Sequence, residues 1–299
     1  MIGLLALLFL LGGSYGSYAY LHDYDLYRGF APPSEPAGIT HGKLLTRRFY
    51  SPALRQERSY LIYLPPGYAR QAAAGRRFPV LYMLHAPVGH ARNYIQTGGL
   101  GVRVDTLLAR GSIRPFVTVI AMAHSPFGTD HEWANGDQGR FEDLVLETVR
   151  DVDANWATRP VRSARMLAGL SAGAYGATNI TLHHPSVFGA FESWSGYYVE
   201  DRKDAFRGAP PARLARNSPA YYLASHGAEL RRSPVTAYLY QGRTDDEPVQ
   251  EMVDFGRQLR AVGSSARVAV YVGKHNWALW RAHFSPMLVF ASRTFEGRS

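Results

Sequence analysis

The segment GLSAG at residues 169–173 matches the pattern G-x-S-x-G and constrains the fold of this chain more than any other stretch. The apolar run 166–170 predicts a short buried strand, and residues 172–184 predict a helix that stops before Pro185. The two glycines leave room for a tight turn that lifts the serine hydroxyl out of the sheet. We therefore predict that Ser171 is a nucleophile on a turn from strand to helix.

A serine hydroxyl is a poor nucleophile near neutral pH, so it needs a base and a carboxylate that orients the base. In the chain order Ser, Asp or Glu, His, the acid and the base both follow later strands. The strand-like run 235–240 leads into a turn with Asp245, and the run 266–272 ends shortly before His275. Because open sheets collect their chemistry at the carboxyl ends of their strands, we predict that these two residues and Ser171 meet at one edge.

Ordinary structural roles are the alternative for several of these residues. Asp245 and Asp246 open an acidic turn that could cap the next helix, and Asp246 is the second choice for the catalytic acid. Three histidines fall on helix patterns, where a structural role is the default: His183, His184 and His283. The chain has no cysteine and no H-E-x-x-H motif. We therefore predict no metal site and no cofactor.

Six spaced segments carry a resemblance that spans roughly residues 60–295. They are residues 63–68, 78–85, 169–176, 217–219, 242–245 and 273–277. Together they resemble the putative esterase family of α/β-hydrolases, which groups esterase D (S-formylglutathione hydrolase), feruloyl and acetyl-xylan esterases, enterochelin esterases and mycolyltransferases. The resemblance implies a serine acyl-transfer mechanism, with Ser171 as nucleophile, His275 as base and Asp245 as acid.

The resemblance also implies two backbone donors for the oxyanion. One is the N–H of Ala172, directly after the nucleophile. The other comes from a His-Gly-x-Gly-Gly loop, which here reads His85-Ala86-Pro87-Val88-Gly89. Proline has no N–H, so the predicted second donor is Val88. Trp133 and Trp277 lie in loops that face the substrate in the family, and they are the predicted substrate contacts, with core packing as the alternative.

Length and patterning predict one large α/β domain. At 299 residues and 46% apolar, the chain can bury a sizeable core. We predict an α/β-hydrolase fold with a mostly parallel central sheet of about eight strands, antiparallel at its start and flanked by helices. The expected strands are 44–50, 60–64, 80–85, 116–123, 166–170, 190–195, 235–240 and 266–272, and further helices are expected at 141–156 and 249–259.

The stretch 200–230 interrupts this pattern and is rich in Arg, Ala and Pro. Long connections inside a compact domain are often functional, so it is predicted as a cap over the active site. The alternative is a surface excursion with one small helix.

The N-terminal residues predict export across a membrane. Residues 2–11 form an apolar run of the length of a signal-peptide core, and adding 12–21 reaches the length of a membrane anchor. Cleavage after Ala19 is one option, but no Lys or Arg precedes the run, so both readings of residues 1–21 stay open. Residues 22–40 predict a linker and 41–299 the catalytic domain. We expect an extracytoplasmic protein, secreted or anchored to the membrane.

The net charge of +9 favours anionic partners such as acidic lipids or envelope polymers. Nearly all of the basic residues are arginine, a bias that codon composition also explains. No basic stripe or nucleic-acid module is present, so no nucleic-acid partner is expected.

The predicted function is hydrolysis of a carboxylic ester through an acyl-enzyme, on a small-molecule, lipid or polysaccharide ester. One alternative is transfer of the acyl group to a sugar or lipid alcohol. The other is a noncatalytic envelope binding protein that retains the fold, motivated by Pro87.

Overall fold

The computed structural model of the chain describes residues 12–14, 35–86, 90–123, 132–200 and 204–297. Its centre is an eight-stranded sheet with the order β1-β2-β4-β3-β7-β8-β9-β10. Pairs β1–β2 and β2–β4 are antiparallel and all other pairs are parallel. The strands are β1 Lys43–Ser51, β2 Gln56–Leu64, β3 Val80–Leu84, β4 Val117–Met122, β7 Arg165–Leu170, β8 Ala190–Trp194, β9 Thr236–Gly242 and β10 Ser265–Tyr271. The predicted mostly parallel sheet with an antiparallel start is confirmed.

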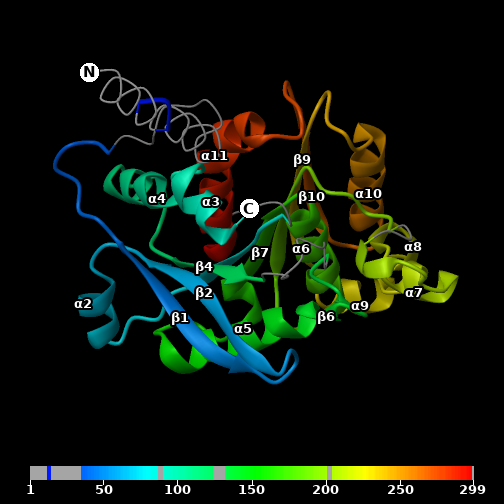
Figure 1. The fold of residues 1–299 in the computed structure, drawn as a ribbon, viewed down its shortest axis with the longest axis horizontal. Coiled ribbons are helices and arrows are strands. Elements are labelled where there is room, and N and C mark those ends of the chain that lie inside the picture. The colour runs from blue at the N-terminus through cyan, green and yellow to red at the C-terminus, as the bar shows by residue number, and fades with distance from the viewer. Residues whose placement is uncertain (1–11, 15–34, 87–89, 124–131, 201–203, 298–299) are drawn as a thin grey trace, which may run out of the picture.

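Helices cover both faces of this sheet (Figure 1). Helices α3, α4 and α11 pack on one face, and α5, α6 and α10 pack on the other. A two-stranded hairpin, β5 Asn135–Gly136 with β6 Gly139–Arg140, precedes α5. The helices are α2 Tyr68–Ala73, α3 Ala91–Gln96, α4 Leu100–Ala109, α5 Phe141–Asn155, η1 Arg162–Ala164, α6 Ala172–His183, η2 Asp204–Phe206, α7 Pro211–Arg216, α8 Pro219–Tyr222, α9 Gly227–Arg232, α10 Val249–Ala261 and α11 Trp277–Phe295.

Side chains of the central strands alternate between the two helical layers, as the strand period of two requires. In β2, Tyr60 and Ile62 join the core under α5, whereas Leu61 and Tyr63 join the core under α3, α4 and α11. All five residues of β3 are buried. Burial on both faces is why these strands read as continuous apolar runs in the sequence.

The predicted cap stretch contains several short helical turns, η2 and α7 to α9, rather than the one small helix of the alternative reading. It packs against α6, where the Tyr175 hydroxyl donates to the carbonyl of Asn217 and the Tyr222 hydroxyl donates to Asn179. It also contacts the β5–β6 hairpin through an ion pair between Arg213 and Asp137. The stretch therefore lies along the helix that begins after Ser171, and its predicted covering of the active site stays a prediction.

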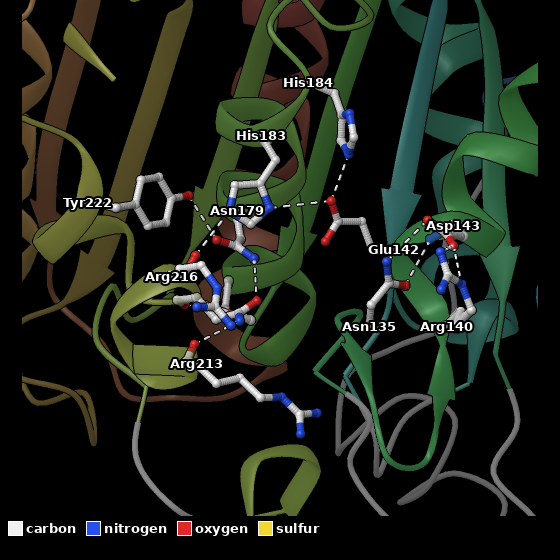
Figure 2. Close-up of polar contacts among 12 residues, drawn as sticks. Asn135, Arg140, Glu142, Asp143, Asn179, His183, His184, Arg213, Arg216 and Tyr222 are labelled. Atoms are coloured by element: carbon white, nitrogen blue, oxygen red, sulfur yellow. Dashed lines mark hydrogen bonds and ion pairs between the residues drawn. The ribbon is translucent and has the colours of Figure 1, made fainter. Parts of the chain in front are cut away.

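Figure 2 shows how α6 is tied to α5 and to this stretch. His183 and His184 both contact one carboxylate oxygen of Glu142, and Nε2 of His183 donates to the carbonyl of Arg216. Burial opposes the charged form of Glu142, but hydrogen bonds and charge from the two histidines outweigh it and lower the pKa of Glu142 to about 2. These contacts give both histidines the structural role that was their default reading.

Within the described residues, no helix is both long enough and apolar enough to cross a bilayer. The predicted signal peptide or anchor lies almost entirely outside those residues, as does most of the predicted linker. The boundaries proposed for the N-terminal segment, the linker and the catalytic domain stay predictions.

Candidate active site

Ser171 occupies a strained turn between β7 and α6. Its backbone has φ 56° and ψ −127°, a conformation that L-residues rarely adopt. The turn is held because the N–H of Ser171 donates to the carbonyl of Trp194 on the neighbouring strand β8, over 3.0 Å. The side chain is thus presented beyond the carboxyl end of the sheet.

The two glycines of the motif serve close approach of backbone to backbone. A Cβ on Gly169 would lie 2.2 Å from the carbonyl oxygen of Gly173. A Cβ on Gly173 would lie 2.1 Å from the carbonyl oxygen of Leu84, at the end of β3. Any side chain at either position would push the start of α6 away from the sheet.

Three predicted residues meet at this edge. Nε2 of His275 lies 2.9 Å from Oγ of Ser171, and Nδ1 of His275 lies 2.7 Å from Oδ1 of Asp245. Asp245 follows β9 and His275 follows β10, so parallel neighbouring strands deliver both. The partner of the imidazole is Asp245 and not Asp246, whose backbone N–H instead donates to Oδ1 of Asp245.

The electrostatics of the three groups are coupled. The side chain of Asp245 is completely buried, which favours its neutral form, but hydrogen bonds from His275 and Ser195 outweigh burial and lower its pKa. Burial also opposes a charged His275. The hydrogen bond and charge of Asp245, with Asp246 and Glu247 nearby, outweigh this and raise the pKa of His275. The site therefore stabilises an imidazolium next to a carboxylate.

Ser195 is a member of this site that sequence reasoning did not single out. It lies fully buried directly after β8, with φ 53°, and its N–H donates to the carbonyl of Tyr240 over 2.8 Å. Its hydroxyl donates to Asp245 and accepts from Nε1 of Trp280 over 3.0 Å. The sequence did carry one signal that could have identified Ser195. Like Asp245, it lies just after a core strand.

The loop with His275 is closed by a helix cap. The side chain of Asn276 accepts from the N–H groups of Ala278 and Leu279, at 3.1 and 3.3 Å, and so begins α11 directly after the histidine. Trp280, one turn into α11, meets the His275 ring edge to face with centroids 5.2 Å apart. The cap and the indole together restrict how the imidazole can move.

The structure describes only one of the two predicted oxyanion donors, Ala172. Ala172 is the first residue of α6, so its N–H belongs to the first helical turn, which has no carbonyl partner within the helix. Such an N–H beside Ser171 is suited to an oxyanion. Val88, together with Pro87 and Gly89, lies outside the described residues.

The predicted substrate contacts, Trp133 and Trp277, are both largely buried. Trp133 is 1% exposed, and its Nε1 donates to the carbonyl of His85 over 2.9 Å. It also packs where a Cβ on Gly176 would lie only 2.6 Å from the Cβ of Trp133. Trp277 packs against the ring of Tyr94. These contacts support the loop after β3 and the start of α11, and a direct contact with substrate stays a prediction.

Comparison with known proteins adds an independent observation. Residues 51–291 match the model of the family described as "Putative esterase". The chain belongs to this esterase family. The resemblance found in the sequence motifs is thereby confirmed, and it supports the predicted class of enzyme, a carboxylic ester hydrolase.

Individual proteins similar to this chain are also named as esterases or as a related hydrolase. The chain is 31% identical over 175 residues to an endo-1,4-beta-xylanase/feruloyl esterase of Xylanibacter ruminicola, an alignment that covers 56% of this chain and 23% of that protein. A ferulic acid esterase structure superimposes with a TM-score of 0.75 at 22% identity, covering 85% of this chain and 99% of the other. An S-formylglutathione hydrolase of Staphylococcus aureus has a TM-score of 0.68 at 16% identity, covering 85% and 100%. The two structures confirm the α/β-hydrolase fold.

Proposed function

We propose that the protein hydrolyses carboxylic esters through an acyl-enzyme on Ser171. The observation that carries the proposal is the pair of contacts of His275, with Ser171 at 2.9 Å and Asp245 at 2.7 Å. Both lie within the range of real hydrogen bonds, and each joins the ring nitrogen to the partner that the chemistry requires.

In the proposed reaction, Oγ of Ser171 attacks the ester carbonyl while Nε2 of His275 takes the hydroxyl proton. The Nδ1–H of His275 donates to Asp245 throughout, so the imidazolium is stabilised as it forms. The Ala172 N–H donates to the oxyanion, with Val88 as the proposed second donor. His275 then returns the proton to the departing alcohol, and water releases the acid by the same steps in reverse order.

One relative and the N-terminal sequence bear on the substrate to test and on the location of the protein. A relative named a feruloyl esterase makes aromatic carboxylic esters the first class to test. The apolar N-terminal run in the sequence supports the proposed extracytoplasmic location.

A fluorophosphonate probe and the Ser171→Ala variant test the proposal. Wild-type protein should be labelled on Ser171 and should hydrolyse nitrophenyl acetate or methyl ferulate, whereas S171A should lose both properties, with kcat/KM lower by about 10⁴-fold or more. Circular dichroism should show that S171A stays folded. Folded wild-type protein that neither labels nor hydrolyses any ester would overturn the proposal in favour of a binding protein. Acyl transfer to an added alcohol in preference to water would indicate a transferase.

A further inference from the structure

An arginine-lined hollow of about 760 Å³ lies at the opposite edge of the sheet from Ser171. Its charged lining residues are Arg76, Arg77, Arg114, Arg159 and Glu296. The arginines come from segments that precede strands β3, β4 and β7, whereas Ser171 follows β7. A strand of five or six residues spans about 16–20 Å, so the hollow is well separated from the candidate active site.

The backbone around the hollow is fixed. The N–H of Phe78 donates to the carbonyl of Ala157, and the N–H of Arg159 donates back to the carbonyl of Phe78, at 2.8 and 2.9 Å. The N–H of Arg114 donates to Oγ of Ser292 on α11 over 2.8 Å. The N–H of Val117 donates to the carbonyl of Pro79 over 2.9 Å, so hydrogen bonds join all three segments that carry these arginines.

The charges on this frame are poorly balanced. Nε of Arg114 pairs with Glu296 at 3.3 Å, while Arg76 donates to the neutral side chain of Gln71 and lies over the ring of Phe78. Nε of Arg159 is shielded from solvent and has no hydrogen-bond partner among the residues that the structure describes. A neighbouring hollow shares Arg114 and Glu296 and adds Arg293. Among the described residues, four arginines and one glutamate thus line the first cavity, with Arg293 in the hollow beside it.

We propose that this cavity binds an anion with two or more phosphoryl groups. The planar fork of a guanidinium matches phosphate oxygens in pairs, and charge-assisted hydrogen bonds of this kind are among the stronger ones in proteins. A single monoanion would leave most of these positive charges uncompensated. The distance from Ser171 means that occupancy leaves ester hydrolysis unchanged, so this proposal does not rest on the proposed function.

Calorimetric titration of the full chain with tripolyphosphate tests the proposal. Wild-type protein should bind saturably, and R76Q/R77Q should weaken binding by about tenfold or more. R231Q/R232Q, an adjacent exposed pair on α9, removes the same charge elsewhere and should change affinity by less than about twofold. E296Q should bind more tightly, a gain that a folding defect would not produce.

Three different results would overturn the proposal of an anion site. No saturable binding by wild-type protein, or equal losses in the two arginine pairs, would overturn the proposal. Binding to phosphatidylglycerol vesicles without binding to tripolyphosphate would also overturn it and would indicate a membrane surface as the partner. Ester hydrolysis measured in the same samples reports on the active site separately, so either proposal can fail alone.

Discussion

At the scale of single residues, the candidate site is a chain of hydrogen bonds that begins in α11. Nε1 of Trp280 donates to Ser195, Ser195 donates to Asp245, and Asp245 accepts from His275, which meets Ser171. Each member is oriented by the one before it, so the position of the base depends on a residue that never touches substrate. Orientation of this kind is worth large factors in rate because small displacements of the base are costly.

Replacement of Ser195 by Ala tests this orientation. We expect kcat for ester hydrolysis to fall by about tenfold with little change in KM. The base form of His275 is the active one, so activity rises with pH through its raised pKa. Ser195 lowers the pKa of Asp245, so its loss makes this carboxylate a stronger acceptor, raises the pKa of His275 further and should move the acid limb of the pH profile to higher pH.

Ser193 offers a matched control for this variant. It is also fully buried in the same segment, but its hydroxyl bonds to Tyr198 at 3.1 Å, away from Asp245. S193A should therefore leave the acid limb in place. An equal effect of the two variants, or an unmoved acid limb in S195A, would contradict the role assigned to Ser195.

At the scale of elements, the start of α6 determines the geometry of the candidate site. The helix approaches β3 so closely that Gly173 touches the backbone of Leu84, and this approach sets where Ser171 and the Ala172 N–H point. The contact of His183 with Glu142 of α5 holds the helix at its other end.

Replacement of Gly173 by Ala should displace the start of α6 from β3. The new Cβ would lie 2.1 Å from the Leu84 carbonyl oxygen, so we expect a loss of stability of about 3 kcal/mol and the loss of most hydrolysis. Urea unfolding and an ester assay measure the two effects.

Gly101 provides the control, because it is likewise the second residue of a helix, α4, and a Cβ there would lie 3.2 Å from a ring atom of Tyr63. G101A should lose much less stability than G173A and keep its hydrolysis, because the Tyr63 ring has to yield by only a few tenths of an ångström. A fully active and stable G173A would show that the close approach of α6 to β3 is not required.

At the scale of the whole molecule, the central sheet carries a buried acid on an interior strand, β8. Glu192 is fully buried in β8, and one of its oxygens accepts from Nε1 of Trp194 over 2.9 Å. Burial raises its pKa to about 8. The folded protein therefore holds this carboxyl in its neutral form near pH 7.

The stability of the wild-type protein should consequently depend on pH. A raised pKa in the folded state gives a contribution that is complete below the ordinary pKa of 4.5 and is lost as pH rises towards about 8. We expect the free energy of unfolding to include a downward component over that range. E192Q, which cannot ionise, should remove it.

Urea midpoints at acidic and mildly alkaline pH measure this component. Glu229 is exposed on α9, so E229Q should keep the wild-type dependence and serves as the control. If E192Q and the wild-type protein showed the same pH dependence, Glu192 would not be neutral in the folded state.

The sequence by itself determined the sheet, its antiparallel start and the three residues that meet at its edge. This was possible because strand and helix periodicities and the glycine-flanked serine are local patterns. The contacts between Trp280 and Ser195, 85 residues apart, were decided only by the tertiary structure. The same holds for the burial of Trp133 and for α11, which continues through Pro286 because its apolar face packs on the sheet. Such contacts depend on which distant side chains share a space, and no local pattern encodes that.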